Sequence, residues 1–305
     1  MKLWKKMTMI QKFQCNELFC LILIRRSREH DSDDVSDVSM SMDVGGRDEE
    51  SAKSYARRVD FSRRFEYPTH IVSINMIPPQ SSMHEWIISP RAEGVRCFVI
   101  AHHNRTVSRR VNGTLLHSFR SIWPGGGIRG GNMKRDTQDN STIIDCVYNA
   151  QRRTYYIVDL LQYRSYALFE TTFEFRLWFV RAKLEEMTLK RNAAIRADTN
   201  NDYSFNLLPA YELTLSNWSR LYQHIIHTNS MLQRTQTQSQ PPDVPCSDDE
   251  DADTSTETMS VDDSTGIDVD CRADGILLRH KESFYQSGVS ELCLLYRDDQ
   301  LALMS

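Results

Sequence analysis

The chain has 305 residues, of which 40% are hydrophobic and 10% aromatic, and this allows one large domain or two small ones with a substantial core. Its net charge of −4 conceals an asymmetry, because residues 51–231 and 271–305 carry 28 Lys and Arg against 20 Asp and Glu. The folded part is therefore expected to be basic and the remaining tracts acidic. This balance suits a polyanionic ligand such as RNA, with ordinary surface charge as the alternative.

The cysteines exclude two common classes of small-domain scaffold. There are seven, and no two form a Cys-x-x-Cys pair. An odd number without paired spacing argues against a disulfide framework and against a zinc site, and it fits a reducing compartment. We therefore expect no metal and no cofactor.

The N-terminal segment, residues 1–66, is expected to lie outside the main domain. Its apolar run at 18–24 follows Lys5 and Lys6 but is followed at once by Arg25 and Arg26, without a small-residue cleavage site. The run is too short to span a membrane, so we expect a short helix or an irregular start, with a secretory signal as the alternative. Residues 29–50 are acidic and rich in Ser, which predicts a disordered linker. A basic helix is expected within 51–66.

From residue 67 to 305 the pattern predicts a domain of short strands and two helices. Strands are expected at 86–90, 96–101, 141–148, 154–163 and 291–297, a strand-like run at 273–288 and a Gly-rich loop at 123–132. A helix is expected at 171–191, where Phe175, Trp178 and Phe179 recur near helical spacing and are interpreted as core. A second helix at 213–228 has Ser216 as its predicted N-cap. Residues from about 232 to 270 are predicted to form a disordered acidic insertion.

Residues 91–96, Arg-Ala-Glu-Gly-Val-Arg, follow a predicted strand and match part of a catalytic motif. Nucleotidyltransferases of the capping-enzyme and ligase type use Lys-x-Asp-Gly-x-Arg, in which the Lys attacks the nucleotide α-phosphate. Here Gly94 and Arg96 are present, but Arg91 replaces the Lys. A guanidinium remains protonated and is not a useful nucleophile, so the sequence predicts no catalysis.

Later segments resemble the same superfamily in the same order, namely 145–148, 156–161, 274–278 and 294–297. A closer resemblance is to the snurportin family, carried by Pro-Gly-Gly at 124–126, Thr-Ile-Ile-Asp-Cys-Val-Tyr-Asn at 142–149, Thr-Tyr-Tyr-Ile-Val-Asp at 154–159, Phe-Glu-Phe-Arg at 173–176, and Asp-Gly-Ile-Leu-Leu at 274–278 ahead of His280 and Lys281. The similarity covers about 68–231 and 271–297.

The resemblance to snurportins implies both a fold and a function. The fold is α+β, a capping-enzyme or nucleotidyltransferase-like domain with a twisted, largely antiparallel sheet that forms a nucleotide cleft. The function is binding of the 2,2,7-trimethylguanosine cap of spliceosomal U snRNAs, without catalysis. The family acts as an snRNP import adaptor that shuttles between nucleus and cytoplasm with importin-β and an exportin. No membrane association is implied.

The family's cap site maps onto six residues of this chain, which are Ser73, Arg91, Arg96, Leu295, Tyr296 and Arg297. Arg96 and Arg297 are expected to meet the phosphates. The family's two cap-site tryptophans are missing, because residues 71–75 contain none and Leu295 stands at the second position. Tyr296 is the substitute ring if the register slips by one, and Trp86, Trp123, Tyr148 and Tyr285 are further candidates.

Three hypotheses follow from these matches and departures. The first is a cap-binding import adaptor. The second is an active nucleotidyltransferase, which the missing Lys opposes. The third is a scaffold that retains the fold but has lost the cap site. Residues 1–50 contain no basic amphipathic helix of the kind that snurportins use for importin-β, so direct importin-β binding is in doubt.

Overall fold

The structure is a computed structural model, and it describes residues 60–127 without 74, 75, 77 and 80, together with 140–194, 203–237 and 272–297. The predictions for residues 1–59, for most of the Gly-rich loop and for most of the acidic insertion lie outside these residues. Of the basic helix expected within 51–66, residues 60–62 are described and are helical.

One sheet, called sheet A, combines both ends of the domain. Its five strands follow the order β1 (Glu66–Ile71), β12 (Gly288–Tyr296), β11 (Ala273–His280), β2 (Trp86–Ala92) and β10 (Tyr211–Glu212). β1 runs parallel to β12, whereas the other neighbouring strands are antiparallel. A short 3-10 helix, η3 (Met83–Glu85), leads into β2.

The second sheet, sheet B, is formed mainly by consecutive strands. The order is β5 (Leu115–Phe119), β4 (Arg105–Arg110), β3 (Val95–His102), β6 (Thr142–Asn149), β7 (Thr154–Tyr163) and β8 (Tyr166–Ala167), and β9 (Ser204–Leu207) pairs in parallel with β7. The result is the mixed α+β fold with largely antiparallel sheets that the sequence predicted.

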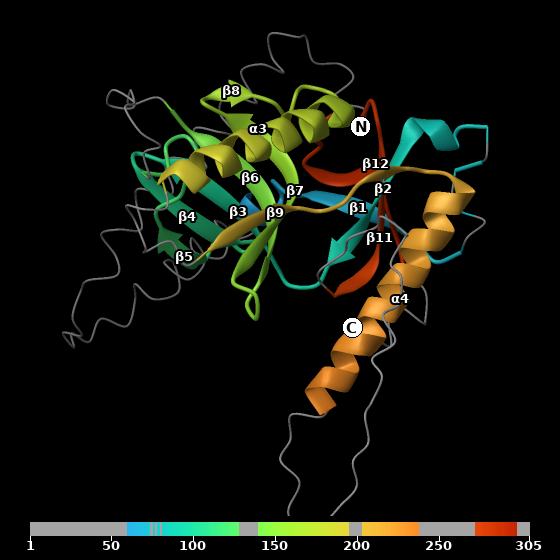
Figure 1. The fold of residues 1–305 in the computed structure, drawn as a ribbon. Helices are drawn as coiled ribbons and strands as arrows, with labels where there is room; N and C mark the ends of the chain where they lie inside the picture. Colours follow the sequence, from blue (N-terminus) through green and yellow to red (C-terminus); the bar gives the residue numbers. More distant parts are fainter. Residues whose placement is uncertain are drawn as a thin grey trace, which may run out of the picture.

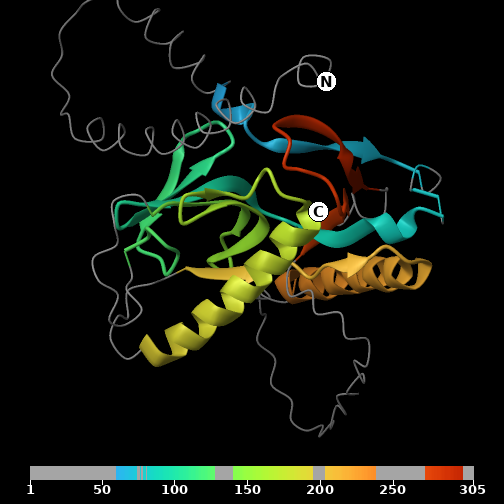
Figure 2. The ribbon, with the colours of Figure 1, turned by 90° about the horizontal axis from the view of Figure 1, so that it is seen from above.

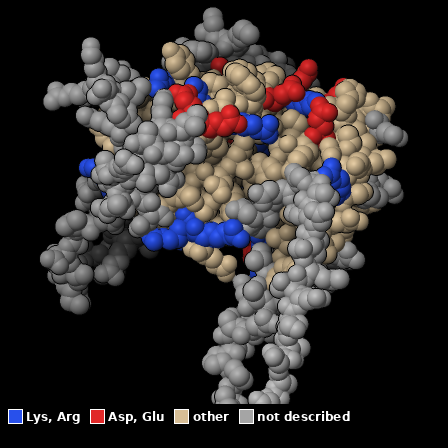
Figure 3. All heavy atoms as spheres, viewed as in Figure 1, with Lys and Arg blue, Asp and Glu red and all other residues tan. Residues whose placement is uncertain are grey.

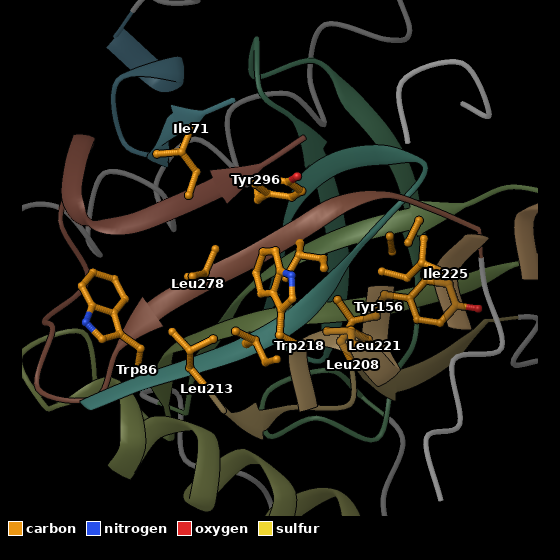
Figure 4. Packing of buried hydrophobic residues seen from close by; sticks show 14 of the residues in the cluster. Ile71, Trp86, Tyr156, Leu208, Leu213, Trp218, Leu221, Ile225, Leu278 and Tyr296 are labelled. Atoms are coloured by element: carbon orange, nitrogen blue, oxygen red, sulfur yellow. The ribbon is translucent and has the colours of Figure 1, made fainter. Parts of the chain in front are cut away.

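Two helices cover the sheets. Helix α3 (Phe173–Ala194) crosses sheet B, and α4 (Leu215–Thr237) lies along sheet A (Figures 1 and 2). Trp218, Leu221 and Ile225 of α4 pack against the sheet A side chains Ile88, Ile276, Leu278 and Tyr296 (Figure 4). Successive residues of a strand point to opposite faces of the sheet. Alternate residues of β2 and β11 therefore face α4 and contribute to this apolar layer.

Two helix predictions were wrong. Trp178 and Phe175 of α3 are 61% and 41% exposed, because the face that packs on sheet B carries Phe173, Arg176 and Val180 instead. The N-cap of α4 is Thr214 and not Ser216, since the helix begins at Leu215 and the Thr214 hydroxyl accepts a hydrogen bond from the backbone N–H of Asn217 at 3.1 Å.

A buried ionic network joins the two sheets through Asp159 of β7. Arg176 donates two parallel hydrogen bonds to Asp159, each of 2.9 Å, and both side chains are 1% exposed. Arg279 of β11 donates to the Val158 carbonyl at 3.0 Å and to Asp159 at 3.3 Å. Glu66 of β1 lies 3.8 Å from the Arg279 guanidinium. One carboxylate therefore ties α3, sheet A and sheet B together.

Removing the Arg176 guanidinium should destabilise the fold strongly. Arg176→Met leaves Asp159 with Arg279 alone, and breaking a buried ion pair from one side costs about 3–5 kcal/mol. The half-buried pair Lys183–Glu186 on the same helix provides the control, because it reaches solvent and Lys183→Met should cost about 1 kcal/mol or less. Urea unfolding measures both changes, and equal losses for the two variants would contradict a structural role for the network.

Glu66 gives a pH dependence of stability with a defined sign. Burial raises the pKa of its carboxyl, and the charge of Arg279 opposes this only in part. The folded state therefore holds this proton more tightly, so the contribution of Glu66 to stability is present below the ordinary pKa of 4.5 and is lost as pH rises. Glu66→Gln keeps an acceptor for the Gln286 N–H and cannot ionise.

The free energy of unfolding of Glu66→Gln relative to wild type should therefore increase from about pH 4 to about pH 7. Glu212→Gln is the control of opposite sign, because Lys281 lowers the pKa of the exposed Glu212 carboxyl. Urea unfolding at a series of pH values measures both slopes. A relative stability of Glu66→Gln that falls with pH would count against this reading of the buried carboxyl.

Candidate functional site

The turn between β2 and β3 connects sheet A to sheet B and carries the residues of the degenerate motif. Arg91 lies at the end of β2 and Arg96 at the start of β3, with Gly94 between them. Gly94 has φ of 150°, and a Cβ at this position would lie 2.4 Å from the Tyr148 carbonyl oxygen. The close approach requires glycine, so the motif's Gly is retained here for packing.

Arg91 and Arg297 meet at one carboxylate, Asp274 at the start of β11. The Nη1 of Arg91 and the Nη2 of Arg297 both donate to Asp274 Oδ2, and Arg297 Nε donates to the Asp274 carbonyl at 3.0 Å. The two arginine side chains are 37% and 34% exposed, whereas Asp274 is 12% exposed. We call these three residues the arginine clamp. It presents two cations held by one anion at the surface of sheet A.

Asp274 also has a buried oxygen with an unused acceptor capacity. Its Oδ1 is inaccessible and has no hydrogen-bond partner among the described residues. Buried acceptors normally have a partner, so this oxygen is an unsatisfied acceptor beneath the two arginines.

Arg96 is held by sheet B and does not join the arginine clamp. Its Nε and Nη2 donate to the two oxygens of buried Asp145 at 3.1 and 2.6 Å. Its guanidinium lies 5.3 Å from the ring centre of Phe65 and 5.9 Å from that of Tyr67. Desolvation opposes the charge on Arg96, but the ion pair and hydrogen bonds with Asp145 outweigh it and raise its pKa. The site residue predicted to meet phosphate is thus already paired with a carboxylate.

Leu295 and Tyr296 lie on opposite faces of β12. Leu295 is 2% exposed and packs with Leu277 and Cys293, whereas Tyr296 is 8% exposed and packs edge-to-face on Trp218 of α4 at 5.0 Å. Tyr296 therefore does not replace a ring at position 295, because successive residues of a strand point in opposite directions. The expectation that Tyr296 supplies the stacking contact does not fit this register.

Ser73 lies two residues after the end of β1. The last residue of β1, Ile71, pairs with Tyr296, which directly precedes Arg297. β1 ends at Ile71, whose carbonyl accepts a hydrogen bond from the Arg297 N–H at 3.4 Å. Ser73 is half-buried, and its carbonyl accepts from the Met76 N–H at 3.0 Å. The structure thus brings the residues after β1, Arg91 and Arg297 to the same end of sheet A.

The other candidate rings are packed inside the protein. Trp86, Trp123, Tyr148 and Tyr285 are 8%, 1%, 7% and 8% exposed. The Tyr285 hydroxyl donates to Asp145 at 3.0 Å, so this ring has a structural partner in place. None of the four presents a face for stacking.

Sequence reasoning missed the acidic residues that organise the site. Asp145 and Asp274 stood in recognised segments, yet their partners Arg96 and Arg91 lie 49 and 183 residues away in the chain. Tyr67 was also missed, although it is half-buried beside the Arg96 guanidinium. The sequence did contain a signal for these ion pairs. It was an arginine-containing motif in a domain whose apolar strands β6, β7 and β11 each carry a single Asp.

A metal site and a membrane-spanning helix are two further features to consider in the described residues. Within 60–127, 140–194, 203–237 and 272–297, no group of three or more His, Cys, Asp or Glu side chains is arranged to hold a metal ion. No helix in the described part of the chain has the length and apolar character needed to cross a membrane.

Known structures similar to this chain are DNA ligases. A mycobacterial DNA ligase D complexed with ATP and MES has 13% identity and a TM-score of 0.39, over 78% of this chain and 61% of the ligase. A Chlorella virus DNA ligase-adenylate has 11% identity and a TM-score of 0.33, over 76% of this chain and 68% of the ligase. The chain thus spans about three fifths of the mycobacterial enzyme's length.

A protein-family comparison matches one continuous stretch of the chain. The family described as "Snurportin1, m3G cap-binding domain" matches residues 73–231, just over half of the 305 residues. The matched region begins just after β1, includes β2, β10, all of sheet B and most of α4, and leaves out β1, β11 and β12 of sheet A. The chain belongs to the snurportin family, as a member that contains its m3G cap-binding domain.

Proposed function

We propose that this chain binds the methylated guanosine cap of RNA at the arginine clamp and does not modify it. The observation that carries the proposal is the convergence of Arg91 and Arg297 on Asp274, with both guanidinium groups about one-third exposed. Membership of the m3G cap-binding family supports the choice of ligand.

The arginine clamp suits the phosphate bridge of a cap. A guanidinium offers several N–H donors in a plane and engages phosphate oxygens bidentately. Asp274 holds the two arginines in position before the ligand arrives, which lowers the conformational cost of binding. Two cations and one anion leave a local charge of +1, so an anionic ligand is attracted.

The recognition of methylation is expected to be weak in this chain. A methylated, positively charged purine is favoured by an electron-rich ring, and such stacking contributes roughly 1–3 kcal/mol per base. Leu295 and the segment after β1 lack the family's tryptophans, and the four candidate replacements are buried. Binding in this proposal therefore depends mainly on phosphate contacts.

A second candidate function is that of a protein-interaction scaffold with little cap binding. The specific observation in its favour is the packing around Leu295. A Cβ built on Gly275 would lie 2.9 Å from Leu295 Cδ1, so this corner of the sheet has no free space. A residue that fills its own pocket leaves no room there for a base.

The transport role is the finer part of the proposal. A cap-binding member of this family would carry capped spliceosomal snRNPs between cytoplasm and nucleus, with importin-β and an exportin as receptors. Cap binding would be the first step of this transport role. Direct binding of importin-β is the weakest part of this role, because residues 1–50 contain no basic amphipathic helix of the family's kind.

The first test is the loss of affinity when the arginine clamp is removed. Arg297→Ala and Arg91→Ala should each weaken cap binding by roughly 10- to 100-fold, the range of one charge-assisted hydrogen bond of about 1.5–3 kcal/mol. The loss should be equal for trimethylated, monomethylated and unmethylated cap dinucleotides, because phosphates carry no methylation signal.

Fluorescence titration with the three dinucleotides measures these affinities. Arg120→Ala is a matched control, because Arg120 is an exposed arginine at the far edge of sheet B. Unchanged affinity in both arginine-clamp variants would place the ligand elsewhere. No measurable affinity in the wild type would favour the scaffold.

The second test concerns catalysis. With Arg91 in place of the nucleophilic Lys, incubation with labelled nucleoside triphosphate and Mg²⁺ should give no covalent adduct. Denaturing electrophoresis followed by autoradiography detects any phosphoramidate. A labelled band from the wild-type chain would show that another residue acts as nucleophile and that the protein is an enzyme.

A further inference from the structure

Helix α3 presents an apolar stripe to solvent. Trp178 is 61% exposed and Phe175 41% exposed, and their ring centres lie 5.8 Å apart. Phe179 lies 5.9 Å from Phe175, and half-buried Ala182 continues the stripe one turn further. Exposed apolar clusters of this kind mark interaction surfaces in soluble proteins.

The stripe cannot turn inward, because the opposite side of α3 is anchored. Arg176 is bound to Asp159, and Val180 and Met187 are buried in the layer on sheet B. These contacts fix the rotation of the helix about its axis. The exposed rings therefore remain on the surface in every state in which the fold is intact.

A row of charges runs beside the stripe on the same outward face. Glu174, Arg181 and Glu185 are exposed. At about 100° per residue, Glu174 and Arg181 lie about 40° and 60° to one side of Trp178, and Phe175 and Ala182 lie at similar angles on the other side. Figure 3 shows acidic and basic side chains next to one another along the course of α3.

This arrangement is self-complementary about a two-fold axis. If two copies of α3 pack antiparallel with the axis at Trp178, Glu174 of one copy lies beside Arg181 of the other, and the same pair is repeated by symmetry. Phe175 then faces Ala182 of the second copy, a large side chain against a small one. The spacing of four residues before Trp178 and three after it gives this match.

We propose that α3 is the interface of a homodimer of this chain, with Trp178 at the two-fold axis. An interface made mainly by one helix face is small, so the association is expected to be weak and dependent on concentration. The proposal is independent of cap binding.

Other occupants fit the charges less well. Residues 1–28 contain an apolar run but also carry seven Lys and Arg and one Glu. Their positive charge would be repelled by Arg181. The acidic tract at 29–50 and nucleic acid would each be repelled by Glu174 and Glu185. Only a partner with alternating charge matches the row, and an inverted second copy supplies it.

Charge exchange in the full chain tests the proposal. Glu174→Arg and Arg181→Glu, each alone, place like charges across the axis and should weaken dimerisation about 10-fold or more. The double variant carries the pair in reverse and should return to within about 3-fold of the wild type. Trp178→Ala should also weaken the dimer. Sedimentation equilibrium over a range of protein concentrations measures each dissociation constant.

Two controls separate the interface from general effects of charge and folding. Glu291→Arg on β12 and Arg152→Glu make the same changes of charge at exposed positions away from α3 and should leave the dimer unchanged. Glu174→Arg also opposes the helix dipole, but the double variant has the same cost, so its recovery isolates the contact between copies. A wild type that stays monomeric, or a double variant without recovery, overturns the proposal.

Discussion

The carboxylate of Asp159 holds the whole arrangement in place. It lies inside sheet B and receives guanidinium groups from α3 and from β11 of sheet A. An unpaired buried carboxylate would cost several kcal/mol, so the sheets and the helix must keep the geometry that satisfies it. The outward direction of Trp178 follows from this constraint, because Arg176 is on the opposite face of α3. Hydrophobic packing alone would allow the helix to rotate.

The same chemical solution recurs in the core and at the candidate site, because Asp145, Asp159 and Asp274 each bind arginine. The three pairs differ in exposure, and this difference decides their roles. The Asp159 pair is fully buried and structural, the Asp145 pair is partly covered, and Asp274 holds its two arginines at the surface. A cationic surface that is fixed by an internal acid stays ordered without ligand, which is the property that a phosphate-binding site requires.

Strands β2, β3, β6, β7, β11 and β12 and the two helices followed from alternation and spacing, because β-branched and aromatic runs such as 142–149 and 154–163 have few other ways to bury their side chains. Shorter or more polar strands such as β4, β5 and β9 were not predicted. These patterns did not show which face of a helix or strand is buried. Phe175 and Trp178 were predicted to be core because apolar residues are expected inside. The buried face of α3 instead carries Arg176, whose partner Asp159 is on another strand and is not revealed by local patterns. The positions of Leu295 and Tyr296 depended on strand register, which the pairing of β12 with β11 and β1 sets.

The parallel pairing of β1 with β12 has a consequence for how the chain is made. Residues 66–71 lie against residues 288–296, whereas sheet B is built mostly from the continuous stretch 95–167. During synthesis, sheet B can assemble on the ribosome while sheet A still lacks the strands that the last part of the message encodes. β1 must therefore wait, with its hydrogen-bonding groups solvated, until the final strands emerge. The nascent chain is vulnerable to chaperone capture and to misassembly during this interval, and the completed molecule acquires its arginine clamp only when Arg297 has joined Arg91.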